Sequence, residues 1–177
     1  QGAQVTADRF ALQRGVHAIS VSGTLQEHGS QNIQVQVTQL PLADLRPFVT
    51  SLPPVDGDVN ASLHVTGTLA SPEATVDLTT SPLTVHDQSY AGLTGHAVYQ
   101  DEKITLSAVF RQDTAHTLAL EGTLPVSLHL RGEQPLSQVG DADFRLHSDG
   151  INMAPFGFAT GDEVRDIEGI TRIDLSL

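Results

Sequence analysis

The sequence contains no cysteine, no tryptophan and a single lysine, Lys103. Without cysteine the chain cannot form a disulfide, a thiolate zinc site or a cysteine nucleophile. Acidic residues outnumber basic residues by 21 to 9, which gives a formal net charge of −12 with neutral histidines. Because proteins bind nucleic acid and anionic lipid headgroups largely through Lys and Arg, this balance argues against both partners. A lipid would have to be held through apolar contacts.

Long apolar segments and targeting signals are also missing. No run of 18 apolar residues occurs, and the chain begins at Gln1 without the cationic and apolar regions of a signal peptide. With 39% hydrophobic and 17% charged residues, the composition is that of a folded chain. We therefore expect an internal segment of a longer protein.

The patterns of common enzymes are absent as well. The sequence has no HExxH, no glycine-rich phosphate loop and no GxSxG. Its histidines do not form the i, i+2 or i, i+4 sets of a metal site, and adjacent acids such as Asp101 and Glu102 would face opposite ways in a strand. The Asp-x-Asp segments at 56–58 and 141–143 lack the further oxygen ligands of a calcium loop. We expect no enzyme activity, no cofactor and no metal site.

The sequence does have period-two alternation in many short segments. Residues 104–110, for example, place large apolar and polar side chains in opposite phases. Such alternation predicts strands with one dry and one wet face, as in antiparallel sheets, and the Gly, Pro, Asp and Ser between segments predict short turns. Apolar residues with helical spacing predict one short helix near residues 42–52. The predicted fold class is all-β.

Two kinds of repeat are present. Gly23, Gly67 and Gly122 each precede Thr-Leu and fall on the apolar phase, where a missing side chain suits a bulge or the close approach of a neighbouring backbone. A longer, weaker repeat relates residues 41–67 to 150–177, in which Gly57 and Gly169 each introduce an alternating strand. We expect residues 1–177 to be a single fragment of a longer β-repeat.

The apolar phase has two interpretations, which composition leaves open. It could form the closed core of a sandwich or barrel, but such cores ordinarily contain aromatic anchors, and aromatic residues make up only 5% of this chain. It could instead line an open groove, which the long-period repeat favours because repeats build extended arrays.

The order of these features resembles the TamB family of AsmA-like proteins over nearly the whole chain. The resemblance is carried by residues 42–48, by the triplet 55–57, by the strand ending in 65–72, and by the similar stretches 122–125 and 149–154. It implies a long antiparallel sheet curved into an open taco or gutter with an apolar concave face. It also implies the periplasmic part of an inner-membrane-anchored protein of a diderm bacterium, whose anchor lies outside this sequence.

The resemblance further implies transport of phospholipid toward the outer membrane. A linked role in outer-membrane protein assembly would use a barrel partner, bound through regions outside this sequence. Acyl chains would lie in the apolar groove, and each methylene removed from water would contribute about 0.8 kcal/mol. The predicted lining residues are Ile19, Val21, Val35, Leu63, Val65, Val76, Leu78, Leu106, Phe110, Leu118, Leu120, Leu128, Leu130 and Leu146.

Two other functions fit the same alternation. A scaffolding β module would pack its apolar face shut and bind a protein partner without lipid. A carbohydrate-binding sandwich is disfavoured because sugar rings commonly stack on aromatic faces, and the chain has no Trp and two Tyr.

Overall fold

The computed structural model describes residues 4–45, 47, 54–85, 88–128, 136–152 and 169–176, and their strands confirm the predicted all-β class. The elements are β1 Gln4–Arg14, β2 His17–Gln26, β3 Asn32–Pro41, the 3-10 helix η1 Leu42–Leu45, β4 Val55–Asp56, β5 Asp58–Gly67, β6 Pro72–Thr80, β7 Leu83–Val85, β8 Gln88–Tyr90, β9 Gly92–Gln100, β10 Lys103–Arg111, β11 Thr117–Leu128, β12 Leu136–Gln138, β13 Asp143–Asn152 and β14 Ile170–Ser176.

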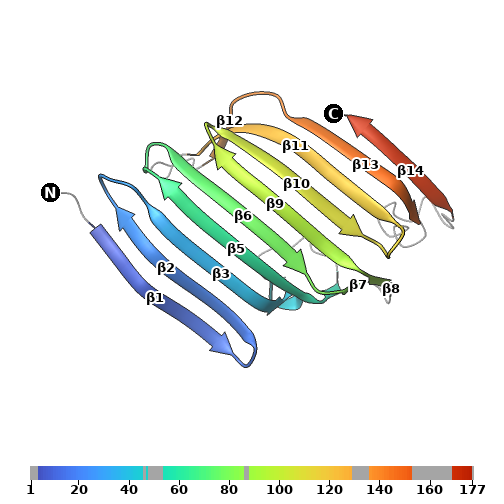
Figure 1. The fold of residues 1–177 in the computed structure, drawn as a ribbon, viewed down its shortest axis with the longest axis horizontal. Coiled ribbons are helices and arrows are strands. Elements are labelled where there is room, and N and C mark those ends of the chain that lie inside the picture. The colour runs from blue at the N-terminus through green and yellow to red at the C-terminus, as the bar shows by residue number, and fades with distance from the viewer. Residues whose placement is uncertain are drawn as a thin grey trace.

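One large antiparallel sheet dominates the fold (Figure 1). Ten strands follow one another in the order β1-β2-β3-β5-β6-β9-β10-β11-β13-β14, and β12 pairs with β11. Most neighbours in the sheet are joined by tight turns. Between β9 and β10, Asp101 and Glu102 both have positive φ, 53° and 56°, as in the two-residue hairpin that matches the twist of the strands. The sheet is not closed into a barrel, which confirms the prediction of a long open antiparallel sheet.

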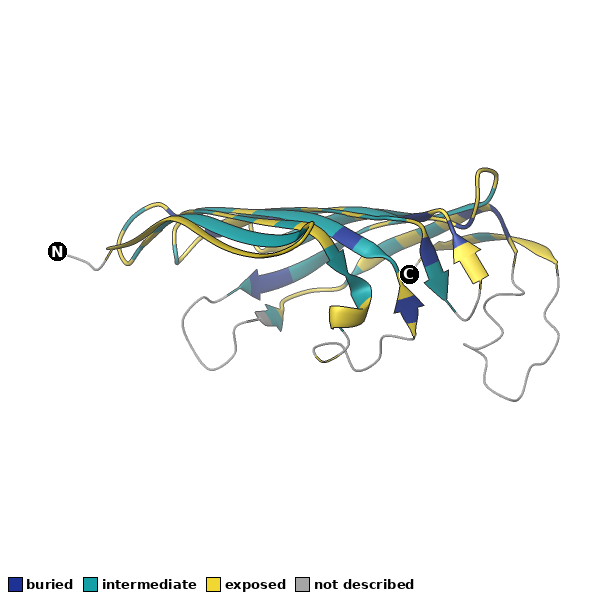
Figure 2. Cartoon of the chain, turned by 90° about the horizontal axis from the view of Figure 1, so that it is seen from below, coloured by how far each residue is buried: buried dark blue, intermediate teal, exposed yellow. Residues whose placement is uncertain are grey.

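A second, three-stranded sheet, β4-β7-β8, lies at one end of the long strands. Its residues Val55, Leu83 and Tyr90 are buried and pack with Leu42 of η1 and Phe110 of β10. The rings of Tyr90 and Phe110 lie 5.2 Å apart between centroids at an angle of 50°, a favourable tilted arrangement. Figure 2 shows η1 and the short strands on the same side of the large sheet.

The predicted helix near residues 42–52 is a 3-10 helix of four residues, Leu42–Leu45, in its described part. Residue 46 and residues 48–52 lie outside the described residues. The backbone N–H of Leu42 donates to the carbonyl of Gly57 at 2.9 Å, which ties this turn to the entry of β5. Leu42 is the residue directly after β3, and it packs against the small core of the second sheet.

The two halves of the long repeat share a distinctive strand geometry. The pairing of β3 with β5 shifts register between Val37 and Leu40, and the pairing of β13 with β14 shifts between Ser148 and Ile151. In each case the residue just before the pairing resumes has a positive φ, 46° at Gln39 and 150° at Gly150. Gly57 and Gly169, with φ of 137° and 128°, then precede β5 and β14. Residues 153–168 of the second half lie outside the described residues.

Two buried glutamines complete the backbone hydrogen bonding where strands of the large sheet end. The side-chain amide of Gln31 donates to the carbonyl of Gln26 at 2.7 Å and accepts from its N–H at 2.9 Å. Gln112 forms the same two-bond pair with Asn152, at 2.9 and 2.7 Å. Each amide therefore takes the place of a neighbouring peptide group, so that the backbone groups it covers are satisfied where the regular strand pairing stops.

The glycines that precede Thr-Leu lie against neighbouring backbone, as expected from the sequence. A Cβ atom on Gly23 would overlap the carbonyl of Asn32, and one on Gly122 would overlap the ring of Phe144 and the carbonyl of Asp143. Phe144 is directly opposite Gly122 in the sheet, so its ring occupies the space that a side chain at 122 would need.

We predict that Gly122→Ala destabilises the fold by about 1–3 kcal/mol, because the methyl group meets an immobile carbonyl and a packed ring. Gly95→Ala is the matched control, since the nearest atom to its added Cβ is 3.9 Å away. Its effect should stay within about 0.5 kcal/mol. Urea unfolding midpoints at unchanged m-value measure both; equal midpoints for the two variants would contradict the prediction.

Candidate functional site

The strand register gathers the apolar phase of the sequence on one face of the large sheet. Residues directly opposite each other in an antiparallel pair point to the same face. A first row crosses the sheet from β1 to β13 as Phe10, Val21, Val35, Leu63, Val76, Ala97, Leu106, Gly122 and Phe144. The second row runs from β1 to β14 as Leu12, Ile19, Val37, Ala61, Leu78, Gly95, Ala108, Leu120, Leu146 and Leu175. We call this surface the apolar face; neither row contains a charged residue.

The opposite surface, the wet face, is polar along the matching rows. One such row consists of Ser20, Gln36, Ser62, Asp77, His96, Ser107, Glu121, Arg145 and Ser176. Within it, His96 Nδ1 lies 2.7 Å from Asp77 Oδ1, and both side chains remain exposed. The large sheet therefore separates an apolar surface from a solvated one.

The described lining residues predicted from the sequence lie on the apolar face, with the exception of Leu128. Leu128 lies beyond the main sheet, where it borders a hollow of about 410 Å³ with the β2–β3 and β5–β6 loops. Leu130 lies outside the described residues. Each of the other predicted residues is partly exposed, and none belongs to the buried core.

The buried apolar residues lie instead near the ends of the long strands. They are Val55, Val59, Leu83, Tyr90, Tyr99, Val126 and Ile151. A closed sandwich of this size would bury the middle of its inner face, because two packed sheets exclude water between them. The described part of the chain thus covers the apolar face at the strand ends and leaves its middle rows partly accessible.

At the end of the long strands opposite the β4-β7-β8 sheet, the apolar face is covered by the last residues of β11, Val126–Leu128. We call these residues the β11 tail. The N–H of Leu128 donates to the hydroxyl of Tyr99 at 3.0 Å. Val126 N–H donates to the carbonyl of Glu102 at 2.8 Å, and the Ser127 hydroxyl donates to the Glu102 carboxylate at 2.8 Å. Because Tyr99 shares the phase of the apolar face, these bonds hold the tail over that face, opposite the β4-β7-β8 end.

Both apolar rows reach the free edge at β1, and the second row also reaches the free edge at β14. On β1, Phe10 is 57% exposed and Leu12 is 59% exposed; on β14, Leu175 is 51% exposed. Exposed large apolar side chains that continue a partly accessible apolar surface mark a site of contact with an apolar molecule or another surface.

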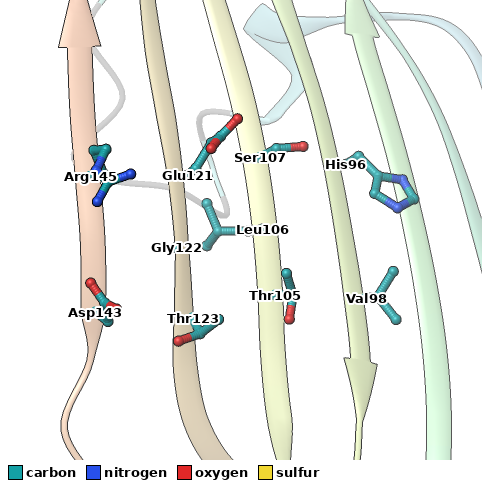
Figure 3. A pocket seen from close by; sticks show the side chains of 10 residues that line it. All are labelled: His96, Val98, Thr105, Leu106, Ser107, Glu121, Gly122, Thr123, Asp143 and Arg145. Carbon is teal, nitrogen blue, oxygen red and sulfur yellow. The ribbon is translucent and has the colours of Figure 1, made fainter.

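A hollow among the described residues lies on the wet face and was not anticipated from the sequence (Figure 3). It measures about 500 Å³. Its lining is His96, Val98, Thr105, Leu106, Ser107, Glu121, Gly122, Thr123, Asp143 and Arg145. The lining carries charges of both signs on neighbouring strands, such as Glu121 and Arg145, which face each other in the register. Wet-phase residues of adjacent strands were visible in the sequence, but their assembly into a hollow depends on strand order.

Two ionisable side chains near the β4-β7-β8 end have shifted pKa values. Burial raises the pKa of the Tyr90 hydroxyl above its ordinary value. The hydrogen bond with His116 is the main cause that lowers the pKa of Asp113, and backbone N–H groups of Ala115 and His116 add to it. Asp113 thereby organises the turn between β10 and β11. No group of three or more metal-binding side chains occurs among the described residues.

Comparisons of the chain with protein-family models, with curated proteins and with solved structures give no match. In the part of the chain that the structure describes, no helix has the length and apolar character needed to cross a membrane.

We predict that Tyr99→Phe loosens the β11 tail, because the Leu128 N–H loses its acceptor in a partly buried place. An unpaired buried donor costs about 1–2 kcal/mol, so amide exchange at Leu128 should accelerate about 5- to 30-fold. Tyr90→Phe, at the other strand end, serves as the control and should leave these amides unchanged. Hydrogen exchange followed by NMR measures both; equal protection at Leu128 in wild type and Tyr99→Phe would refute the role assigned to the hydroxyl.

Asp113 gives a pH-dependent prediction. Its pKa is lower in the folded chain than in the unfolded chain, so below about pH 4 the unfolded state binds the proton first. The stabilisation by Asp113 is therefore complete above that pH and is lost as the pH falls through the folded pKa. The unfolding free energies of wild type and Asp113→Asn should differ at pH 6 and converge toward pH 3. A difference that is constant with pH would rule out this carboxylate as the cause.

Proposed function

We propose that this chain is a segment of a conduit that carries phospholipid between the inner and outer membranes of a diderm bacterium. In this proposal the acyl chains lie on the apolar face and the headgroups stay in solvent. The observation that carries it is the pair of uncharged apolar rows, which run from β1 to β13 and from β1 to β14 while their middle stays partly accessible. The chain acts as a binding surface in this proposal, without catalysis, cofactor or metal.

The composition of the rows supports a sliding mode of transport. The second row has three small residues near its middle, Ala61 on one side of Leu78 and Gly95 and Ala108 on the other, and larger side chains toward the edges. Small side chains leave more space above the backbone at these positions. An alkyl chain bound there gains about 0.8 kcal/mol for each methylene that leaves water. Since no charged group interrupts either row, an acyl chain meets no desolvation barrier from one strand to the next.

The location and the partners follow from the resemblance to the TamB family. We place the chain in the periplasmic part of an inner-membrane-anchored protein, with the anchor supplied by another part of the polypeptide. A linked role in outer-membrane protein assembly would use a barrel partner bound outside this chain. The strongly acidic composition is compatible with lipid binding through apolar contacts alone.

A scaffolding β module is the second candidate. It is favoured by the strand ends, where the β4-β7-β8 sheet and the β11 tail show that the apolar face can serve as a packing surface. In that case a protein partner covers the middle rows and no lipid binds.

Photo-crosslinking in bacterial cells separates the two candidates. A photoreactive residue replaces Leu106, on the apolar face, or Thr105, its neighbour on the wet face. Mass spectrometry of the purified adducts then identifies what each position captures. The conduit requires phospholipid at position 106 and little or none at 105. Capture of protein alone at 106 would instead support the scaffolding module and contradict the conduit.

We predict that Leu106→Asp lowers phospholipid capture by about tenfold or more at a probe placed on Leu120. A carboxylate on the apolar face must lose solvent wherever an acyl chain covers it, which costs more than 1.4 kcal/mol. Thr105→Asp carries the same charge on the wet face and should leave capture unchanged. Urea unfolding of both variants verifies that they remain folded, and equal capture by the two would contradict an acyl-chain path over Leu106.

A further inference from the structure

The outer edge of β14 has the properties of a strand-binding site. Among the described residues β14 pairs only with β13, so the backbone groups of its other side are unpaired by any strand. Its residues are almost all exposed, including Ile170 at 67% and Leu175 at 51%. An exposed edge of this kind is a template for pairing with another strand.

The internal repeat shows what kind of strand fits that edge. The β13–β14 pair reproduces the β3–β5 pair, with the same register shift, the same positive φ before the pairing resumes, and the same glycine before the second strand. In the first copy the outer edge of β5 is covered by β6, in antiparallel register from Val59 opposite Thr80 to Gly67 opposite Pro72. The outer edge of β14 is therefore equivalent to the edge of β5 that β6 occupies.

The register of β6 can be transferred to β14 position by position. In the first copy Ala61 faces Leu78 and Leu63 faces Val76, both on the apolar face. The equivalent positions on β14 are Ile173 and Leu175, whose apolar side chains call for apolar partners in the same places.

The charges on β14 modify the wet phase of the pattern. Ser62, which faces Asp77 of β6, corresponds to Asp174, and Asn60, which faces Thr79, corresponds to Arg172. An acidic residue opposite Asp174 would be destabilising, because like charges directly opposite repel across a strand pair. A basic residue opposite Asp174 and an acidic residue opposite Arg172 would each form a favourable pair.

We infer that the outer edge of β14 binds an antiparallel β-strand of another polypeptide segment with the pattern apolar, basic, apolar, acidic, read opposite Leu175, Asp174, Ile173 and Arg172. This binding would extend the sheet and its apolar face by one strand. It is independent of the proposed function, since strand pairing uses backbone and cross-strand contacts and needs no lipid.

A second copy of the chain fits the same edge less well. The ten strands of the sheet alternate in direction, so β1 and β14 run in opposite directions. The β1 strand of a second copy placed beside β14 in the same orientation would therefore pair with it in antiparallel fashion. Placing its Leu12 and Phe10 opposite Ile173 and Leu175 leaves Ala11 opposite Asp174, with no charge pair. β1 is also irregular, with a bulge between Ala7 and Phe10 in its pairing with β2. Bulged edges resist continued pairing.

A charge-swap experiment tests the pattern. A labelled peptide with the sequence of Pro72–Thr80 and the changes Asp77→Lys and Thr79→Glu is compared with one that has Thr79→Glu alone. Fluorescence anisotropy measures the affinity of each for the wild-type chain and for Asp174→Lys. Wild type should prefer the lysine peptide by about 2- to 5-fold, and Asp174→Lys should reverse the preference.

Cysteine pairing locates the bound peptide, because the chain has no cysteine of its own. A peptide with Val76→Cys should form a disulfide with Leu175→Cys in preference to Leu12→Cys on β1, and a peptide with Leu78→Cys should react less with Leu175→Cys. The reversed preference together with capture at position 175 supports the inference.

Three results would overturn it. The first is an affinity that is indifferent to the charge opposite Asp174, or no binding of either peptide. The second is capture on β1 at least as strong as on β14. The third is a disulfide between Phe10→Cys of one chain and Leu175→Cys of another without peptide, which would assign the edge to a second copy.

Discussion

The register of the antiparallel strands is the constraint on which the other properties of this protein depend. Side chains alternate between the two faces of a strand, so a shift of one residue between any two strands would move a whole set of apolar side chains into water. The rows of opposite residues continue across the sheet, with register shifts confined to the β1–β2, β3–β5 and β13–β14 pairs. Val35, Leu106 and Leu146 therefore share one surface although they are far apart in sequence. The accessible apolar surface and the solvated one are two results of the same pairing.

Stability of such a sheet comes mainly from its strand ends. The middle rows are partly exposed and so gain only part of the free energy that full burial provides. The buried contacts are concentrated where Tyr90 packs on Phe110 at one end and, at the other, in the β11 tail, where Val126 is buried and Leu128 is hydrogen-bonded to Tyr99. The amides of Gln31 and Gln112 satisfy backbone groups in the same regions. This division leaves the centre of the sheet partly exposed while the strand ends supply the buried contacts.

The sequence predicts the strands and the apolar face well, because period-two alternation is a local property that can be read from single segments such as residues 104–110. It predicts the close approach at Gly122 for a similar reason. It does not predict the wall made by the β11 tail, since Leu128 continues the apolar phase and only the contact with Tyr99 shows that it has left the sheet. The hollow near Glu121 and Arg145 was also missed, because it depends on which strands are neighbours.

The strand order has a consequence for how the chain acquires its structure. Nearly every strand of the large sheet pairs with the strand just before or after it, and the β3–β5, β6–β9 and β11–β13 connections only bypass short strands. Contacts of small sequence separation close with little loss of chain entropy, so each hairpin can form as soon as its two strands are available. The sheet can therefore assemble in sequence order while the polypeptide is being synthesised, with every completed hairpin serving as the template for the next.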